Sequence, residues 1–501
     1  MADGRLECSA SAVVASTAKQ HQGRKKERNL MPNNQPNQGK RRTKPLLADT
    51  IGRSLSTSLL GHSASNAISD GNEEYSSRSL AVPFSMSMHS ISGSAYSYAS
   101  SSNTLTPSSY ETSSDTASRY TSDESSDSIR HVYNPYTSYA ETNRVVSLDG
   151  KACRRDVDIL AAKYGSVSHM GLLDPSYSVF VSDDRTGGIC FKTLYKVAVV
   201  MGDPLCETGD IPRLLSEFKQ YRRRKRWNMS ILGAGEGFVR YYNDVKKRST
   251  ILQFAKERTL NPLTNEVLHE TSGKRIITQC RQLLDPNKGG ITIEVYIPLL
   301  QDPEPKLETD LAAIYDEWRI ARNQSGKPQA FITEYDPFLM PHLMTYIYTR
   351  GPDGEMKGFA GLRRIGPKAG YHIDPCIAAP GTRKGISDLL LFASMAYLRQ
   401  LGVSYLSLGY EPSESLVPIS EMSPSIAHLT RGIYRHTFRR LPISGKRAYF
   451  DKFKPDDDQD SPVYLIFHSR LPEPRQVVSV AHVANISIRR LLFGETQSKD
   501  S

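Results

Sequence analysis

Residues 370–411 read GYHIDPCIAAPGTRKGISDLLLFASMAYLRQLGVSYLSLGYE, and this stretch decides the fold. An extended run is followed by a basic, glycine-bearing turn, GTRKGIS (381–387), by a helix predicted over residues 387–402, and by a second extended run. We expect Ser387 to cap the helix. The N–H groups of the turn and the positive helix end would then face a phosphate or carbonyl oxygen. The stretch therefore predicts an α/β unit that binds an activated acyl donor.

This order of elements is typical of acyltransferases of the GNAT type. The turn alone is explained equally well if Arg383 and Lys384 are solvated residues before an ordinary core helix. The rest of the chain has to decide between the two interpretations.

The first 150 residues do not look like a folded domain. Serine makes up roughly a third of residues 51–130, so this part cannot bury enough apolar surface to offset the entropy cost of ordering. We expect residues 1–150 to form a disordered, serine-rich tail. The net charge of the whole chain is +11, and the tail contributes only one unit of it. A basic folded region suits a polyanionic partner such as nucleic acid, anionic lipid or a phosphorylated cofactor.

Several classes of protein are disfavoured by composition. The six cysteines are scattered, with no CxxC pair and no histidine at zinc-ligand spacing, so we expect no metal. The longest apolar run, residues 389–398, is far shorter than the ~20 residues that a membrane span needs. We expect a cytoplasmic protein, either soluble or peripheral on a membrane, that needs no cofactor.

The folded part shows the same order of elements twice. In a first unit, strands are expected over residues 177–183, 188–204, 227–235 and 291–298, and helices over 210–226 and 237–247. A second unit follows, with a helix over 308–324, a strand over 329–335, either a helix over 341–349 or a hairpin over 344–366, and then residues 370–411. The pattern predicts two tandem α/β units, 151–300 and 301–475, and a C-terminal amphipathic segment, 476–501.

A glycine-rich turn in the first unit is a weak candidate for nucleotide binding. Residues 233–237 read GAGEG after a predicted strand, but the dinucleotide pattern would need a glycine at Phe238. A tight turn is the favoured interpretation, with Glu236 as a candidate cleft residue.

A covalent acyl-enzyme is not expected, because no GxSxG motif and no evident Ser, His and Asp set occur. Direct transfer needs a base or a solvent path for the acceptor's proton, and donors for the oxyanion. Ionisable residues gather at predicted strand ends of the second unit: His372, Asp374, Glu411, Tyr434 and Lys452. Taken singly, each of these is more often structural than catalytic.

Cations cluster in both units, in YRRRKR (221–226), GKRIITQCR (273–281) and RGIYRHTFRR (431–440). The interleaved aromatics would allow base stacking as well as phosphate contact. A solvated helix face explains YRRRKR equally well. It explains RGIYRHTFRR less well, because apolar residues share that segment.

Seven segments, taken in order, resemble the C-terminal catalytic domain of the phosphatidylglycerol lysyltransferases. They are MGDP (201–204), the GxGE turn at Gly233, HIDPC (372–376), GISDLL (385–390), LSLGYEP (406–412), IYRHTFRRL (433–441), and KRAYFDKFKP (446–455) followed by VYLIF. The resemblance covers residues 155–470, approximately. It implies two GNAT-like units in tandem and the transfer of an aminoacyl group from aminoacyl-tRNA to a lipid hydroxyl.

HIDPC and LGYEP resemble more closely the fungal branch of this family, whose members esterify the 3β-hydroxyl of ergosterol. The freestanding members of that branch imply glycyl-tRNA as the donor and a sterol-containing membrane as the source of the acceptor. Within the family, phosphatidylglycerol is the alternative acceptor. From other classes, an acyl-CoA-dependent N-acetyltransferase and a non-catalytic RNA- or lipid-binding module remain alternatives.

The resemblance also suggests roles for single residues. Asp374 would hold the donor's α-ammonium group or take the acceptor's proton, and Glu411 and Tyr434 would line the reaction centre. The remaining basic residues would contact the terminal phosphates, the oxyanion or the acceptor stem: Arg383, Lys384, Lys452, Arg281 and Lys274.

The acceptor lipid and the membrane lead to two further expectations. A sterol would need an apolar slot, which we expect between the two units. Residues 477–494 would either lie on a membrane, with Arg489 and Arg490 at the headgroups, or pack as a helix on the second unit.

Overall fold

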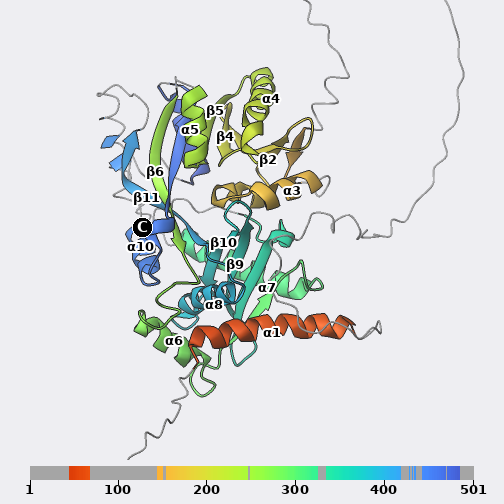
Figure 1. The fold of residues 1–501 in the computed structure, drawn as a ribbon, viewed down its shortest axis with the longest axis vertical. Coiled ribbons are helices and arrows are strands. Elements are labelled where there is room, and N and C mark those ends of the chain that lie inside the picture. The colour runs from red at the N-terminus through yellow and green to blue at the C-terminus, as the bar shows by residue number, and fades with distance from the viewer. Residues whose placement is uncertain are drawn as a thin grey trace, which may run out of the picture. The chain divides into compact units, whose positions relative to one another are not determined.

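The computed structural model describes residues 45–67, 144–149, 154–245, 249–324, 335–418, 443–469 and 471–485, with a few residues between 428 and 435. Twelve strands form one sheet in the order β1-β2-β3-β4-β5-β12-β6-β11-β10-β9-β8-β7 (Figure 1). Their bounds are β1 Val145–Ser147, β2 Ser178–Val181, β3 Gly188–Leu194, β4 Val197–Met201, β5 Asn228–Ala234, β6 Thr250–Leu260, β7 Thr292–Tyr296, β8 Met344–Arg350, β9 Met356–Ile365, β10 Gly370–Ala378, β11 Leu406–Pro418 and β12 Ser461–Phe467.

Helices lie on both faces of this sheet. They are α1 Leu47–Ala67, α3 Arg155–Tyr164, α4 Ile211–Arg224, α5 Glu236–Val245, α6 Lys274–Leu284, α7 Pro305–Gln324, α8 Ile386–Gln400, α10 Ile443–Asp451 and α11 Pro474–Val483. A 3₁₀ segment, Val167–Leu173, follows α3. None of these described helices combines the length and the apolar composition needed to cross a membrane.

The sheet consists of two halves with the same connectivity. The first half contains β1 to β5 and then β12, and the second contains β7 to β11 and then β6. All neighbouring strands within the halves are antiparallel except β4 with β5 and β10 with β11. A helix joins each parallel pair, α4 in the first half and α8 in the second. The tandem α/β arrangement predicted from the sequence is therefore confirmed.

The two halves exchange one strand each. β6 follows β5 in the chain but pairs with β11, whereas β12 follows β11 but pairs with β5. The exchanged strands also pair with each other at the centre of the sheet. The expected boundary near residue 300 does not separate the halves, because β7 pairs with β8 and α6 packs with α8 in one core.

Most local predictions agree with the structure, and three differ. The run 188–204 is a hairpin, β3 and β4, which turns at Tyr195 and Lys196. Residues 344–350 form β8, so the hairpin interpretation is right and the helix over 341–349 is wrong. α8 is capped by Gly385, whose φ of 101° favours glycine, and not by Ser387, which lies inside the helix. The strand expected over 329–335 lies outside the described residues apart from Tyr335.

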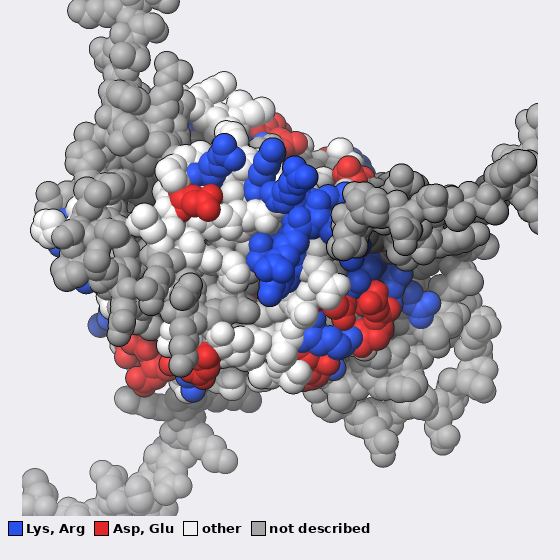
Figure 2. Space-filling model, turned by 90° about the horizontal axis from the view of Figure 1, so that it is seen from above, with Lys and Arg blue, Asp and Glu red and all other residues white. Residues whose placement is uncertain are grey.

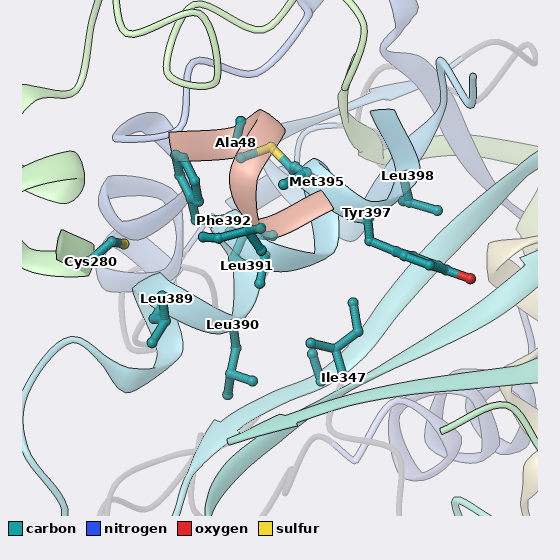
Figure 3. Close-up of a cluster of buried hydrophobic side chains, with 14 of the residues drawn as sticks. Ala48, Cys280, Ile347, Leu389, Leu390, Leu391, Phe392, Met395, Tyr397 and Leu398 are labelled. Atoms are coloured by element: carbon teal, nitrogen blue, oxygen red, sulfur yellow. The ribbon is translucent and has the colours of Figure 1, made fainter. Parts of the chain in front are cut away.

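The helix α8 forms the core of the second half. It is apolar on all sides and is buried from Leu389 to Leu398. The sheet covers one side, and α6 and α1 cover the others, so that Ala48, Cys280 and Ile347 meet around α8 (Figure 3). This burial holds the strands that α8 connects, β10 and β11, in fixed positions.

Part of the supposed tail is folded, contrary to our expectation of disorder over residues 1–150. In α1, Ala48, Ile51 and Leu55 form an apolar stripe at helical spacing and are buried against α8. The Leu47 N–H donates to Glu270 at 2.9 Å, and Arg399 of α8 pairs with Asp49 at 3.4 Å. The low apolar content of the tail as a whole concealed this short stripe.

We predict that Gly52→Leu displaces α1 from α8. A Cβ at Gly52 would lie 2.6 Å from the carbonyl oxygen of Ala396, which is closer than real Cβ contacts. Overpacking of this kind costs about 1 to 3 kcal/mol in the free energy of unfolding, which denaturant titration measures. Ser54→Leu, at an exposed position of the same helix, is the control and should change stability little. Equal losses in the two variants would contradict close packing at Gly52.

The described part of the C-terminal segment packs on the first half. Gln476 of α11 donates to the carbonyl of Met229 at 2.9 Å, and Ser479 donates to that of Leu194 at 3.1 Å. Packing on the second unit, one of our two expectations, is therefore corrected: α11 lies against β4 and β5. Arg489 and Arg490 lie outside the described residues.

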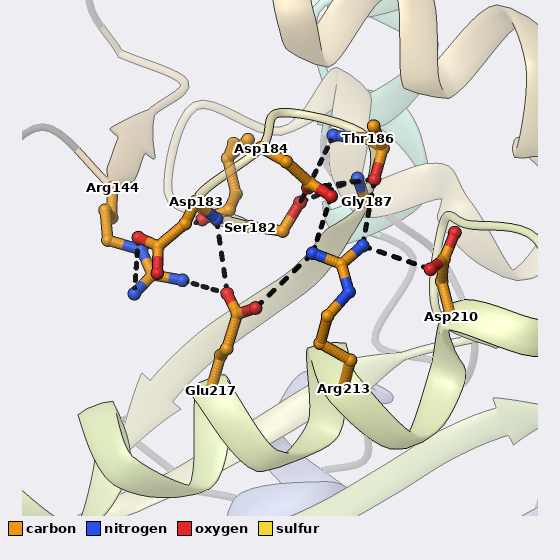
Figure 4. Close-up of polar contacts among 10 residues, drawn as sticks. Arg144, Ser182, Asp183, Asp184, Thr186, Gly187, Asp210, Arg213 and Glu217 are labelled. Atoms are coloured by element: carbon orange, nitrogen blue, oxygen red, sulfur yellow. Dashed lines mark hydrogen bonds and ion pairs between the residues drawn. The ribbon is translucent and has the colours of Figure 1, made fainter.

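Ion pairs on the surface of the first half join β1, the turn between β2 and β3, and α4 (Figure 4). Arg144 pairs with Asp183 at 3.0 Å and with Glu217. Arg213 pairs with Asp184 at 2.6 Å, with Asp210 at 3.1 Å and with Glu217 at 3.6 Å. Because these groups are partly exposed, each pair contributes little stability.

Candidate functional site: the opening between β10 and β11

The parallel strands β10 and β11 separate soon after they pair. They are neighbours only at Tyr371 with Leu406 and at His372 with Ser407. Beyond His372, β10 continues along β9 and β11 continues along β6. In the first half, the corresponding strands β4 and β5 stay paired along the whole length of β4. An opening between parallel strands is therefore a feature of the second half.

Asp374 lies on β10 in this opening, two residues beyond the last pair. Burial raises the pKa of its carboxyl group, while the positive charges of Lys446, Arg363 and Arg322 act to lower it. Lys446 comes from α10. Although the residue as a whole is exposed, its Nζ points inward and lies 3.9 Å from where a Cβ of Gly409 would be. The charges of three cations therefore act on this one carboxylate.

Several buried polar atoms near Asp374 lack a hydrogen-bond partner among the described residues. They are Nδ1 of His372, Nε and Nη1 of Arg363, and the hydroxyl of Tyr335. Arg363 uses its remaining nitrogen to donate to the carbonyl of Ser166, at 2.8 Å, in the first half. Burial lowers the pKa of Arg363 to about 10 and that of His372 well below its usual value. Because unsatisfied buried groups cost about 1 to 3 kcal/mol each, this interior suits a ligand that supplies polar partners.

Of the predicted catalytic residues, Asp374 is placed in the opening together with the predicted cleft residue His372. Glu411, on β11, is held by Nε of Arg258 at 3.3 Å and by Nε of Arg447 at 3.4 Å. Its charge acts on Lys446, as does that of Asp374. Glu411 therefore has its own cationic partners, Arg258 and Arg447, and its charge also acts on Lys446.

The structure gives Tyr434 and Lys452 other partners. The hydroxyl of Tyr434 donates to two main-chain carbonyls, of Ser413 at 2.7 Å and of Phe254 at 3.1 Å, which fixes its segment to the sheet. Lys452 lies 3.6 Å from Asp388 and stacks on the ring of Tyr449. These contacts hold both side chains to groups other than Asp374, and catalytic roles for Tyr434 and Lys452 stay predictions.

The sequence did not identify Lys446 and Arg363 as candidate site residues. Lys446 belongs to the segment KRAYFDKFKP, which also contains Lys452, and only the packing of α10 shows which lysine turns inward. Arg363 is followed by a second arginine in LRRIG; the first is buried and the second is half-buried. Because six successive residues of β9 are buried, residues 358–363, no alternating pattern in that strand singles out Arg363.

The turn GTRKGIS borders a separate groove of about 870 Å³. It is lined by residues of this turn, of α7 and of the loops before β7 and β9, with five cations and four carboxylates in all. Arg383 lines it and donates to the carbonyl of Lys288 at 2.7 Å. Lys384 is exposed, and its carbonyl accepts a hydrogen bond from Gln279 at 2.8 Å. Gln279 also fills the space beside Gly385, so α6 covers part of the turn.

The other predicted binding residues are on the surface. Arg281 is exposed and binds both carboxylate oxygens of Glu270, at 2.8 and 2.7 Å. Lys274 is exposed at the first residue of α6, and Glu236 is exposed at the start of α5, in the first half. None of these three side chains lines the groove at the GTRKGIS turn.

Asp203 of the MGDP segment is the first-half counterpart of Asp374. Each precedes a proline and lies two residues beyond the last residue that pairs with the neighbouring parallel strand. The N–H of Gly235 donates to the Asp203 carboxylate at 2.8 Å, and His169 contacts its carbonyl at 2.9 Å. Burial raises the pKa of Asp203 to about 6.

The raised pKa of Asp203 predicts how stability depends on pH. Between about pH 4 and pH 6 the folded protein holds a proton that the unfolded chain has lost, so stability should fall as the pH rises through this range. We expect Asp203→Asn to add about 1 to 2 kcal/mol at pH 7 and to flatten this dependence, as measured by denaturant unfolding at several pH values. An unchanged pH profile would show that another group is responsible.

The described residues contain no cluster of His, Cys, Asp and Glu that could hold a metal ion. The two halves have the same strand order, and each has a helix between its parallel strands, so the chain has a tandem GNAT-like fold. The family model described as "Phosphatidylglycerol lysyltransferase, C-terminal" matches residues 159–467. The chain belongs to this family, and the extent of the resemblance seen in the sequence is confirmed.

Relatives of known name are distant. The phosphatidylglycerol lysyltransferase of Bacillus subtilis (strain 168) is 22% identical over 291 residues, which are 58% of this chain and 32% of that protein. The lysylphosphatidylglycerol biosynthesis bifunctional protein LysX of Rhodococcus jostii (strain RHA1) is 24% identical over 254 residues, 50% of this chain and 22% of that protein. The chain thus spans a third or less of these two relatives.

Solved structures show the same fold. The structure of L-PGS from Bacillus licheniformis has a TM-score of 0.50 and 19% identity, and the match covers 66% of this chain and 95% of that one. The C-terminal domain of an Agrobacterium fabrum protein described as a lysylphosphatidylglycerol synthetase has a TM-score of 0.50 and 18% identity, with 68% and 98% covered. At this identity the likeness concerns the fold alone.

Proposed function

We propose that this protein transfers an aminoacyl group from aminoacyl-tRNA to the hydroxyl group of a membrane lipid. Membership of the family supports the proposal, as do the names of the relatives, which are phosphatidylglycerol lysyltransferases. The observation that carries it is the opening between β10 and β11, where the charges of Lys446 and Arg363 act on the buried carboxylate of Asp374. An ester carbonyl placed there would meet a base and a positive charge together.

The proposed reaction needs only groups of the opening. Asp374 takes the proton from the acceptor hydroxyl, whose oxygen attacks the carbonyl carbon of the aminoacyl ester. Negative charge develops on the carbonyl oxygen, and Lys446 stabilises it. The tetrahedral intermediate then breaks its bond to the tRNA ribose oxygen, and that oxygen leaves with the proton held by Asp374. Holding both substrates in place would contribute on the order of 7 to 11 kcal/mol.

The charges around Asp374 favour one of its two expected roles. Lys446, Arg363 and Arg322 all act on this carboxylate, so an α-ammonium group would enter an electropositive interior. Repulsion from these cations disfavours ammonium binding and favours the carbonyl oxyanion. We therefore assign Asp374 the role of base.

Direct transfer is also supported by the nearest cysteine, Cys376, whose thiol does not ionise readily. Cys376 lies on β10 beyond Asp374, and burial, followed by the charges of Asp388 and Asp374, raises the pKa of its thiol. A thiol that resists ionisation is a poor nucleophile. An acyl-enzyme on Cys376 is accordingly disfavoured.

We propose ergosterol as the acceptor and glycyl-tRNA as the donor. The support is that the two segments resembling the fungal branch, HIDPC and LGYEP, form the two edges of the opening, on β10 and β11. Residues that differ between branches would thus contact the reacting groups. Phosphatidylglycerol remains the alternative acceptor, and no cofactor is required beyond the aminoacyl-tRNA.

A lipid-labelling experiment tests this function. The full chain is mixed with liposomes that contain ergosterol or phosphatidylglycerol, total tRNA, synthetases and one labelled amino acid at a time, and lipids are then extracted for mass analysis. We expect an ergosteryl glycine ester whose formation RNase abolishes. Labelled phosphatidylglycerol would identify that lipid as the acceptor in place of ergosterol. Transfer from acetyl-CoA that resists RNase would indicate an acetyltransferase. The absence of any labelled lipid would contradict the proposal and favour a binding module.

A further inference from the structure

The end of the first half at which β4 and β5 begin has no role in the proposed reaction. A small pocket of about 320 Å³ lies there, between the β3–β4 turn, the start of β5 and the start of α11. The opposite ends of β4 and β5 carry Asp203 and Gly233, next to the 3₁₀ segment. We call this surface the end face and define it by Tyr195, Lys196, Arg223, Lys225, Arg226, Leu471, Arg475, Val477 and Val478.

The end face carries cations that form no ion pair with another described residue. Lys196, Arg226 and Arg475 line the pocket, and Arg223 and Lys225 lie at the end of α4. Within the described part of the chain, none of these five forms an ion pair, unlike the arginines of Figure 4. Figure 2, which looks down on the first half, shows Lys and Arg gathered in a stripe with Asp and Glu at its margins. Unpaired cations at one place favour an anionic partner.

One carboxylate lies among these cations. Glu473 lines the pocket, but its oxygen accepts a hydrogen bond from Asn228 at 2.9 Å. That bond joins the start of α11 to β5. The surface therefore keeps a clear excess of positive charge.

Apolar side chains lie beside the cations and are largely in solvent. The exposed fraction is 57% for Tyr195, 58% for Leu471, 46% for Val477 and 38% for Val478. Val477 and Val478 belong to α11, whose opposite side, at Gln476 and Val480, is buried on the sheet. The outward side of α11 thus offers apolar groups to a partner.

Three residues of the pocket keep large side chains in a backbone conformation that favours glycine. The φ angles are 48° for Tyr195, 62° for Lys196 and 57° for Arg226. Glycine would relieve the strain at each of these positions, yet an aromatic ring and two cations are present. Strain retained at a surface pocket is consistent with a functional use of the side chains.

We infer that the end face docks on the surface of an anionic lipid bilayer. The cations would bind headgroup phosphates, while Tyr195, Leu471 and the two valines would enter the interfacial region. A structured RNA would also attract the cations, but it offers no apolar phase for leucine and valine side chains. The inference stands on these residues alone and does not depend on the proposed reaction.

Vesicle sedimentation with the full chain tests the inference. The vesicles contain phosphatidylcholine alone or phosphatidylcholine with phosphatidylserine. We expect binding to the anionic vesicles, weakened by salt. Each cation near such a surface raises the partition coefficient onto the vesicles by somewhat more than about fivefold. The double variant Arg226→Gln, Arg475→Gln should therefore bind about thirtyfold more weakly. The double variant Leu471→Ser, Val478→Ser should also bind less, with an unchanged salt dependence.

A matched control removes two cations elsewhere. Arg53→Gln, Arg155→Gln alters exposed arginines of α1 and α3 and should leave partition nearly unchanged. Failure of the unmodified chain to bind anionic vesicles would overturn the inference, as would equal losses in the control. A loss of tRNA affinity in the Arg226 and Arg475 variant, with vesicle binding intact, would overturn it in favour of an RNA surface.

Discussion

Asp374→Asn is expected to lower the rate of aminoacyl transfer by about 10²- to 10⁴-fold, the usual contribution of a general base. Asparagine keeps the size of the side chain but cannot take the acceptor's proton, so the fold should persist while turnover is lost. The measurement is the initial rate of labelled lipid formation at saturating aminoacyl-tRNA. Asp203→Asn is the matched control, because the same change is made where the parallel strands stay paired. Comparable rates for Asp374→Asn and the unmodified chain would remove Asp374 from the mechanism.

The pH profile of the same reaction adds a second measurement. A base works only when ionised, so the rate should fall as the pH drops through the pKa of Asp374, which burial raises. Lys446 acts to lower that pKa. Lys446→Met should therefore move the midpoint of the profile to higher pH, in addition to lowering the rate. A purely structural role of Lys446 would leave the midpoint in place.

Arg258→Met is expected to lower the free energy of unfolding by about 3 to 5 kcal/mol, as happens when one partner of a buried ion pair is removed. The side chain of Arg258 is 8% exposed and lies between β6, β11 and the segment before β12. It pairs with four carboxylates: Glu411 at 3.3 Å, Asp451 at 3.3 Å, Asp457 at 2.5 Å and Asp460 at 2.7 Å. Without it, the largely buried carboxylates of Glu411 and Asp460 would keep only their pairs with Arg447, at 3.4 Å, and Lys256, at 2.9 Å.

Denaturant unfolding at pH 7 measures this loss. The control is Arg213→Met, which also breaks pairs with several carboxylates, but at a site where the arginine is 39% exposed. Pairs of that kind contribute about 1 kcal/mol or less. If the two variants lost equal stability, the contribution of Arg258 to the free energy of unfolding could not be attributed to its burial.

Local structure was predictable because it follows from spacing along the chain. The strand, turn and helix of residues 370–402 could be recognised from apolar runs and glycines. Asp374 stood out as an ionisable residue, although it lies within β10 and not at the end of the strand. The repeat was also visible, since predicted strands and helices follow one another in a similar order twice. These features depend on neighbours within about twenty residues.

Features that depend on distant neighbours could not be predicted. Neither β6 nor β12 was among the strands that we expected, and their exchange depends on pairing across some two hundred residues. The helix α1 is another example, because its stripe of Ala48, Ile51 and Leu55 is buried only through packing against α8. The inward lysine, Lys446, was hidden for the same reason. Pairing and packing partners, rather than element types, were the missing information.

The exchange of β6 and β12 has a consequence for the order in which the protein can fold during synthesis. The first half is nearly complete when residue 260 leaves the ribosome, but its sixth position stays empty until β12, residues 461–467, is made. Until then β5 has a free edge, and free edges invite pairing with other chains. Long-range pairings of this kind form slowly and late. The centre of the sheet is therefore the last part to close, and a nascent chain halted before residue 461 would present a first half without its sixth strand, with free edges on β5 and β6.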